Sequence, residues 1–224
     1  AIDKIAALEG MDITTKVTGH LFASGMAAIH AALMAAVKNG ETIIAQQNIY
    51  GSSYSLLNLL YSQKIINVVW LLESNPQAWE DAFAKNPNAY LAYVETPSNP
   101  NLSIVDIKAV AQIAHQANAR LLVDNTFASP YCQRPFNLGA DIVVHSTTKY
   151  LCGHGVVIGG IVLSNDSEWV NNELYSIVKL FGATPSPFDA WLTDLGLKTF
   201  ELRMQRHCEN AAHMAGWLQN KSSI

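Results

Sequence analysis

The stretch Arg120-Leu-Leu-Val-Asp124 decides the fold, and Ile142-Val-Val-His-Ser-Thr-Thr-Lys149 repeats its pattern. Each contains apolar residues at consecutive positions and ends in residues that carry charged or hydroxyl groups. A strand covered by helices on both faces is apolar at consecutive positions, whereas a half-exposed strand alternates. Both apolar runs are too short for a buried helix. They therefore predict buried parallel strands that lead into polar residues.

Similar runs along the chain predict an alternation of strands and helices. The predicted strands are residues 42–45, 66–71, 90–94, 120–123, 142–145 and 158–163. The predicted helices are residues 27–37, 52–62, 77–85, 107–118, 167–178 and 187–220. Ser24 is expected to cap the first of these helices and Asn39-Gly40 to end it. The last helix is expected to place Leu197, Met204, Cys208, Ala211 and Ala215 on one face. This order predicts an α/β fold, a mostly parallel open sheet covered by helices.

Composition favours a single globular domain over residues 1–224. Half of the chain is hydrophobic (50%) and only 14% is charged, so a disordered chain or a disulfide miniprotein is excluded. The net charge is −4 without a basic cluster, and the apolar runs are of strand length, so we expect neither a nucleic-acid nor a membrane partner. The odd number of cysteines (Cys132, Cys152 and Cys208) predicts buried thiols in a reducing compartment, and hence a cytoplasmic enzyme.

Lys149 is the centre of the functional interpretation. It follows a buried strand, with the hydroxyls of Ser146 and Thr148 close by. A lysine beside a cofactor carbonyl can form a Schiff base, and the hydroxyls can bind a phosphate ester. The alternative is a solvated lysine in a polar loop, which is the commoner place for this residue.

Asp124 ends another buried strand and has two possible roles. It can cap the turn that it makes with Asn125. If both strand ends face one crevice, it can instead hold a protonated pyridine nitrogen while Lys149 holds the aldehyde carbon. A carboxylate keeps such a ring charged, and the charged ring is the better electron sink. Pyridoxal phosphate requires both groups in its binding site, the carboxylate at the ring nitrogen and the lysine at the aldehyde.

Three other places complete the hypothesis, each with a structural alternative. Gly25 and Met26 begin the helix capped by Ser24, whose backbone N–H groups can bind a phosphate or simply belong to a capped helix. Tyr50 follows a strand and can stack on a flat ring or be a half-buried loop residue. Asn99, in a loop with two prolines, can point its amide at a ligand or only form a turn.

The combined motifs resemble the Cys/Met-metabolism (trans-sulfuration) family of pyridoxal-phosphate enzymes, from end to end of the chain. The family includes cystathionine γ-synthase, cystathionine γ-lyase, methionine γ-lyase and O-acetylhomoserine sulfhydrylase. The motifs that carry the resemblance are Phe22-Ala-Ser-Gly-Met-Ala-Ala-Ile29, Glu95-Thr-Pro-Ser-Asn-Pro100, Val123-Asp-Asn-Thr-Phe127, His145-Ser-Thr-Thr-Lys-Tyr150 and Gly153-His-Gly155. The resemblance implies the fold type I of pyridoxal-phosphate-dependent transferases, with residues 1–224 as the cofactor-binding large domain.

The resemblance also implies a role for each site residue. Lys149 is the Schiff-base lysine, Asp124 is the partner of the pyridinium, and Tyr50 stacks on the ring and assists at the substrate. The backbone at Gly25 and Met26 binds the phosphate together with the hydroxyls of Ser146 and Thr148, and Asn99 lies near the phenolic oxygen of the cofactor. In the implied mechanism the substrate amine displaces Lys149, which then removes the Cα proton. Expulsion of the γ-substituent follows, and water or a thiol decides between elimination and replacement.

Several features of the family pattern are not found in this sequence or differ in it. The upstream Tyr-x-Arg motif, which reaches a neighbouring subunit, and the substrate-carboxylate arginine of a C-terminal domain are not found, so we expect a part of a longer, homo-oligomeric enzyme (a dimer of dimers) with shared sites. Arg203 and Arg206 are outside the matching motif and take no role. Ser52 stands where methionine γ-lyases commonly have cysteine, which weakens that assignment. No metal-ligand pattern is evident. The rival interpretation is a truncated, non-catalytic binding or scaffold protein.

Overall fold

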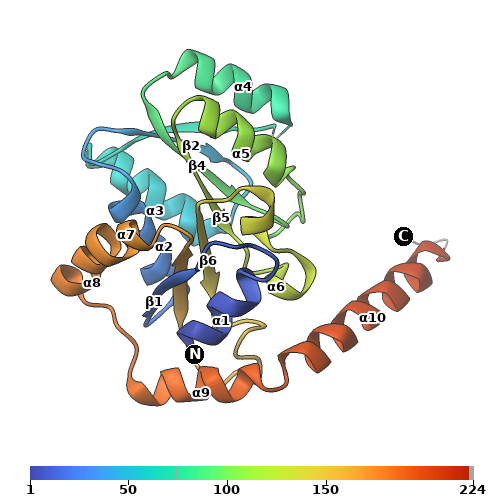
Figure 1. Cartoon of the computed structure of the whole chain (residues 1–224). Helices are drawn as coiled ribbons and strands as arrows, with labels where there is room; N and C mark the ends of the chain where they lie inside the picture. Colours follow the sequence, from blue (N-terminus) through green and yellow to red (C-terminus); the bar gives the residue numbers. More distant parts are fainter. Residues whose placement is uncertain (74, 222–224) are drawn as a thin grey trace.

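The fold is built on a seven-stranded sheet, which Figure 1 shows in a computed structural model that describes residues 1–73 and 75–221. The strand order is β1-β7-β6-β5-β4-β2-β3. The strands are β1 (Thr18–Phe22), β2 (Thr42–Gln46), β3 (Asn67–Leu71), β4 (Ala89–Glu95), β5 (Arg120–Asp124), β6 (Ile142–Ser146) and β7 (Gly160–Ser164). Only β7 runs against its neighbours, because it pairs antiparallel with both β1 and β6. The predicted, mostly parallel sheet is confirmed.

Helices connect the strands and cover both faces of the sheet (Figure 1). Those that precede β7 are α1 (Ile2–Glu9), α2 (Gly25–Ala36), α3 (Gly51–Ser62), α4 (Pro76–Lys85), α5 (Ile107–Gln116), α6 (Ser129–Cys132) and the 3-10 turn η1 (Pro135–Leu138). Those that follow it are α7 (Ser167–Trp169), the π-helical η2 (Val170–Leu174), α8 (Tyr175–Phe181), α9 (Pro187–Leu197) and α10 (Phe200–Gln219). No helix in the described ranges is both long and apolar enough to span a membrane.

The central strands show why their sequences are apolar at consecutive positions. In β4, Ala92 and Val94 pack with α1, α4 and α5, whereas Leu91 and Tyr93 pack with α2 and α3 on the other face. Successive side chains of a strand point to opposite faces, so a strand with helices on both sides must be apolar at every position. The fold therefore contains two apolar cores separated by the sheet.

Helix α2 begins where the sequence indicates and ends earlier than predicted. Ser24 has extended backbone, and its Oγ accepts a hydrogen bond of 3.1 Å from the Ala27 N–H. The helix ends at Ala36, because Val37 has already adopted extended backbone. Gly40, at φ +85°, forms the turn toward β2 and does not itself end the helix.

The antiparallel edge of the sheet was only partly predicted. Strand β1 precedes the motif at Ser24 and was not predicted as a strand, although it pairs with β7 along its whole length. Strand β7 begins at Gly160 and not at Ile158, because the backbone of Gly159 instead bonds to Thr148. A Cβ on Gly160 would lie 2.3 Å from the Ser24 carbonyl oxygen, so only glycine allows this close approach.

The prediction of one helix over residues 187–220 is wrong, since α9 and α10 are separate helices joined at Lys198 and Thr199. Arg203 stabilises the junction from the first turn of α10. Its guanidinium donates to the carbonyl oxygens of Tyr150 at 2.8 Å and Gly196 at 3.0 Å. Arg203 therefore ties the C-terminal helices to the segment that follows Lys149.

Helix α10 extends away from the body of the protein (Figure 1). Of the face predicted to be apolar, Met204 is buried and Leu197 packs against the core, but Cys208, Ala211 and Ala215 are exposed. The expectation of three buried thiols is also wrong, since Cys152 alone is buried. Cys132 and Cys208 are exposed, with their Sγ atoms 3.7 Å apart. The second half of α10 is exposed and packs against no core of residues 1–73 and 75–221.

Candidate active site

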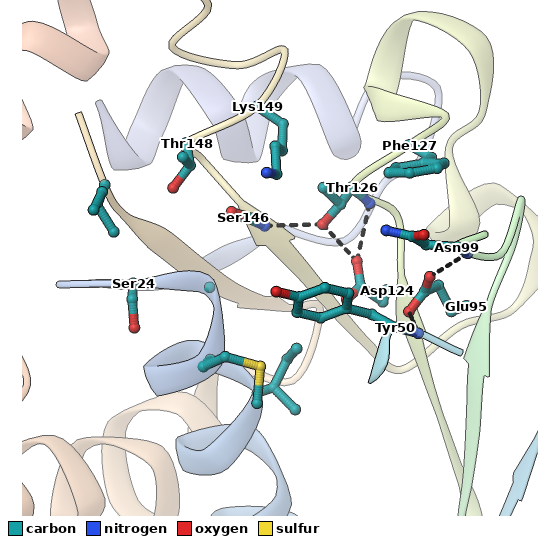
Figure 2. A pocket seen from close by; sticks show the side chains of 14 residues that line it. Ser24, Tyr50, Glu95, Asn99, Asp124, Thr126, Phe127, Ser146, Thr148 and Lys149 are labelled. Atoms are coloured by element: carbon teal, nitrogen blue, oxygen red, sulfur yellow. Dashed lines mark hydrogen bonds between the residues drawn. The ribbon is translucent and has the colours of Figure 1, made fainter. Parts of the chain in front are cut away.

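A cavity of about 270 Å³ opens at the carboxyl ends of the parallel strands (Figure 2). The segments after β1, β2, β4, β5 and β6 all contribute to it, as expected for an open α/β sheet. Its lining residues are Ser24, Gly25, Met26, Ile29, Tyr50, Glu95, Asn99, Asp124, Thr126, Phe127, Ser146, Thr148, Lys149 and Ile158. Every residue predicted for the site is among them. Residues up to 134 positions apart in the sequence thus meet in one cavity.

Six lining residues were not predicted for the site, and all but the last lie in the quoted motifs: Ser24, Ile29, Glu95, Thr126, Phe127 and Ile158. Glu95 ends β4 as Asp124 ends β5, so the signal that selected Asp124 applies equally to Glu95. Thr126 and Phe127 follow Asp124 in the turn after β5. A lone threonine or phenylalanine in a turn carries no signal of its own, so only the structure assigns these two residues to the cavity.

One side of the cavity is formed by the first turn of α2. The N–H groups of a first helical turn have no acceptor within the helix, and they face outward along the positive end of the helix dipole. Gly25 lies against Ser146, where an added Cβ would approach the Ser146 Cβ to 2.8 Å. The absence of a side chain therefore brings the α2 backbone and the Ser146 hydroxyl to the same place.

Ser146 and Thr148, which were predicted as equivalent, differ in the structure. The Thr148 hydroxyl donates to the Gly159 carbonyl oxygen at 3.2 Å and accepts from the Gly159 N–H at 3.0 Å. The Ser146 hydroxyl has no hydrogen-bond partner among residues 1–73 and 75–221. Ser146 is thus free to donate to an anion, whereas Thr148 must first release Gly159.

Asp124 is buried and is held by its neighbour in the turn. Its Oδ1 accepts from the Thr126 N–H at 3.0 Å and from the Thr126 hydroxyl at 2.6 Å. The same hydroxyl accepts from the Ser146 N–H at 2.9 Å, which links the ends of β5 and β6. Burial raises the pKa of Asp124, and the bonds from Thr126 and the charge of His145 oppose this shift. The turn-capping role and the ligand-facing role that the sequence left open occur together.

Glu95 is a second carboxylate in the same cavity. Its pKa is raised to about 7, first by burial and then by the negative charge of Asp124. Within the described ranges neither carboxylate has an ion-pair partner. Two buried carboxylates without such a partner favour a positively charged ligand group.

Lys149 and Tyr50 lie between these two sides. Figure 2 shows the Lys149 amine pointing into the cavity and the Tyr50 ring lying beside Asp124. Tyr50 is the N-cap residue of α3 and is 44% exposed, so one face of its ring is available to a ligand. Lys149 therefore lines the cavity, while it is also exposed and lies in a turn, as the alternative of a lysine in a polar loop had it.

Beneath the cavity lies a buried cluster that the sequence did not indicate. His145 Nε2 is 2.6 Å from Glu9 Oε1, and the Asn125 side chain donates to the same oxygen at 2.7 Å. Both side chains of the pair are fully buried. The cluster joins α1 to the ends of β5 and β6, where Asn125 follows Asp124 and His145 precedes Ser146.

The arrangement suits one kind of ligand. A helix N-terminus with a free hydroxyl binds a phosphate, a buried carboxylate binds a cationic ring nitrogen, and an amine binds an aldehyde. An open α/β sheet that brings these groups into one cavity defines the fold type I class of pyridoxal-phosphate-dependent proteins. The donor set fits that cofactor at both of its ends.

Comparison with known proteins gives the family. The family described as "Cys/Met metabolism PLP-dependent enzyme" matches residues 3–224. The chain belongs to this family, and the resemblance stated from the motifs is confirmed. The cofactor of the family is pyridoxal phosphate, in agreement with the donor set of the cavity.

The relatives carry different activities. L-methionine gamma-lyase of Porphyromonas gingivalis is 41% identical over 223 residues, which is 99% of this chain and 54% of that protein. Cystathionine gamma-synthase of Mycobacterium bovis is 43% identical over 207 residues, or 91% of this chain and 52% of that protein. The chain therefore spans about half the length of the curated relatives it matches.

A solved structure agrees with the fold. Cystathionine gamma synthase from Xanthomonas oryzae pv. oryzae, in complex with cystathionine, superimposes with a TM-score of 0.91 and 38% identity. The match covers 99% of this chain and 55% of that chain. The expected fold type I is confirmed.

Proposed function

We propose that residues 1–224 are the cofactor-binding large domain of a trans-sulfuration enzyme. The enzyme catalyses γ-elimination or γ-replacement on a sulfur amino acid or an O-acylated homoserine. The observation that carries the proposal is that Lys149 and the buried Asp124 face one cavity together with the N-terminus of α2. Family membership supports the reaction class, and the names of the relatives support both a lyase and a synthase.

The proposed phosphate site lies at the first turn of α2. The backbone N–H groups of Gly25 and Met26 donate to the phosphate, and the helix dipole stabilises its charge. The Ser146 hydroxyl donates from beside Gly25, which the close packing of Gly25 on Ser146 supports. Thr148 completes the site once its hydroxyl turns away from Gly159.

The proposed ring site lies at the ends of β4 and β5. Asp124 accepts a hydrogen bond from the protonated ring nitrogen and keeps it charged. Tyr50 stacks on the ring and contacts the substrate, and Asn99 donates its amide to the phenolic oxygen. The cationic ring nitrogen compensates the buried charge of Asp124, which has no ion-pair partner among the described residues.

Lys149 has two proposed tasks. Its amine attaches the cofactor, and after the substrate amine has taken its place it moves the proton at the substrate Cα. When bound, pyridoxal phosphate supplies the electron sink that makes this proton acidic. The cavity supports this assignment because the Lys149 amine points into the space beside Tyr50 (Figure 2).

Substrate choice and assembly belong to the proposal as well. We infer a small amino-acid substrate and a homo-oligomer, a dimer of dimers with active sites shared between subunits. We also infer a reducing, cytoplasmic location from the odd number of widely spaced cysteines in the sequence.

The test is covalent attachment of the cofactor at Lys149. Pyridoxal phosphate is added to the chain and to the variants Lys149→Ala and Lys108→Ala, where Lys108 is an exposed lysine on α5 that serves as control. We expect a visible absorption band in the wild type and the control, and borohydride reduction should leave the label on the peptide that contains Lys149. Lys149→Ala should carry no label. An unlabelled wild type would contradict the proposal and favour the non-catalytic scaffold.

A further inference from the structure

Glu95 connects the two loops that carry the proposed ring contacts. Its Oε2 accepts a hydrogen bond of 2.9 Å from the backbone N–H of Tyr50. Its Oε1 accepts one of 2.7 Å from the backbone N–H of Asn99. A single carboxylate thus holds the segment that follows β2 and the segment that follows β4. Figure 2 shows both hydrogen bonds.

Glu95 is itself held firmly by the sheet. It is the last residue of β4 and only 5% exposed. Its backbone N–H donates to the side chain of Gln46 at 3.2 Å, and Gln46 in turn donates to the carbonyl oxygen of Asn48 at 2.9 Å. The loop from Gln46 to Tyr50 is therefore attached to the end of β4 at two places.

We propose that Glu95 is a positioning residue, which sets the separation of Tyr50 and Asn99 so that both meet the cofactor ring. This inference rests on the proposed function, because it assumes that the cavity binds pyridoxal phosphate. Glu95 acts through the backbone of its two partners. The family resemblance assigned no role to it.

The chemistry explains why this position needs a glutamate. Two N–H donors require two acceptor oxygens, which an ionised carboxylate offers and a glutamine does not. An aspartate keeps the charge but is one methylene shorter, so it cannot reach both loops. The ionised carboxylate is costly without a cationic ligand, because it is buried beside Asp124. A residue that opposes stability and still joins two ligand contacts indicates a functional role.

The experiment compares Glu95→Gln and Glu95→Asp with wild type and with Glu41→Gln. Glu41 is a matched control, because its carboxylate also accepts a backbone N–H, that of Lys38 at 2.7 Å, but lies outside the cavity. Three quantities are measured for each chain at pH 8: the affinity for pyridoxal phosphate, the visible circular dichroism of the bound cofactor, and the melting temperature without cofactor. The dichroism reports how the ring lies among its neighbours.

We expect both Glu95 variants to bind the cofactor about tenfold more weakly. This is the effect expected when one hydrogen bond to a charged group is lost. Their dichroism should decrease, because the ring is no longer held between Tyr50 and Asn99. The melting temperature of Glu95→Gln should not fall below that of wild type, since a buried charge next to Asp124 is removed. The Glu41→Gln control should match wild type in affinity and dichroism.

Three outcomes would overturn the inference. Wild-type affinity and dichroism in Glu95→Gln would remove any role in binding. A loss of affinity in step with a loss of melting temperature would leave Glu95 a structural residue only. If Glu95→Asp had wild-type affinity and dichroism while Glu95→Gln did not, the charge of the carboxylate would matter and its reach to both loops would not. Failure of wild type to bind the cofactor defeats the proposed function itself, so the two failures are distinguishable.

Discussion

The protein buries carboxylates in two neighbouring regions and treats them differently. In the core below the cavity, Glu9 meets His145 at 2.6 Å and accepts a further bond from Asn125. In the cavity, Asp124 and Glu95 accept hydrogen bonds from neutral groups only, and no lysine, arginine or histidine of the described residues pairs with either. Both regions lie at the ends of the same strands.

The difference separates structural charges from functional ones. A buried charge that serves stability needs a partner within the chain, because an unpaired charge in the interior is costly. A buried charge that lacks such a partner is stabilised when a cationic ligand arrives. The raised pKa values of Glu95 and Asp124 record this cost. The following predictions test the contrast, beginning with the largest effect.

Removing the Glu9 carboxylate should destabilise the fold most. Glu9→Ala leaves His145 and Asn125 buried without their acceptor, and breaking a buried pair costs about 3–5 kcal/mol. Urea unfolding measures the loss, with Glu41→Ala, at a half-buried position outside the core, as the control. The affinity of the folded variant for pyridoxal phosphate should change much less. An unaltered free energy of unfolding would argue against a structural role for the pair.

Asp124→Asn should lose cofactor affinity and keep its stability, the reverse of Glu9→Ala. The variant loses the charge that holds the ring nitrogen, so affinity for pyridoxal phosphate should fall about 100-fold, as when one partner of a buried charge pair is truncated. The melting temperature without cofactor should stay equal or rise, because burial disfavours the charge. Asp81→Asn, at an exposed position of α4, is the control. If Asp124→Asn lost stability and affinity together, Asp124 would not differ in kind from Glu9.

The pH dependence of stability should reveal that the buried carboxylate of Glu95 lacks an ion-pair partner among the described residues. The pKa of Glu95 is raised from 4.5 to about 7, so between these values the folded cofactor-free chain binds more protons than the unfolded chain. Its free energy of unfolding therefore falls as pH rises through this window, by about 2–3 kcal/mol from this group. Glu95→Gln should flatten the curve when both chains are unfolded in urea across the range. Identical slopes would contradict the raised pKa.

Thr126→Val should have the smallest effect. It removes the hydroxyl that donates to Asp124 at 2.6 Å and accepts from the Ser146 N–H. The pKa of Asp124 should rise further, and both stability and cofactor affinity should decrease by about 1 kcal/mol. Titration of cofactor into the variant at neutral pH measures this. Thr126→Ser keeps the hydroxyl and should behave as wild type; if it is equally impaired, the methyl group and not the hydrogen bond is responsible.

Local chemistry made much of the fold predictable. Runs such as Leu121-Leu-Val123 specify buried strands, because both faces of each strand meet helices. The polar residues after the strands specify the side of the sheet where a ligand binds, because parallel strands all end on that side. Lys149 and Asp124 could be selected by this rule. Glu95 obeys the same rule and could have been selected with them.

Other features depend on contacts that no local pattern records. Strand β1 exists as the partner of β7, and its own residues do not alternate in a way that predicts it. The break between α9 and α10 depends on Arg203 and the carbonyl oxygens that it reaches. The exposure of Cys208 follows from the direction of α10, which the amphipathic pattern cannot give.

By itself, the sequence determined the α/β class, the side of the sheet where the cavity lies, and the lysine and aspartate that line it. These follow from short-range periodicity and from the geometry of parallel strands. The tertiary structure alone decided which buried charges are paired. Glu9 and His145 are 136 positions apart, and Glu95 and Tyr50 are 45 apart. Whether a charge finds a partner depends on the packing of distant segments, so only the folded chain separates structural from functional carboxylates.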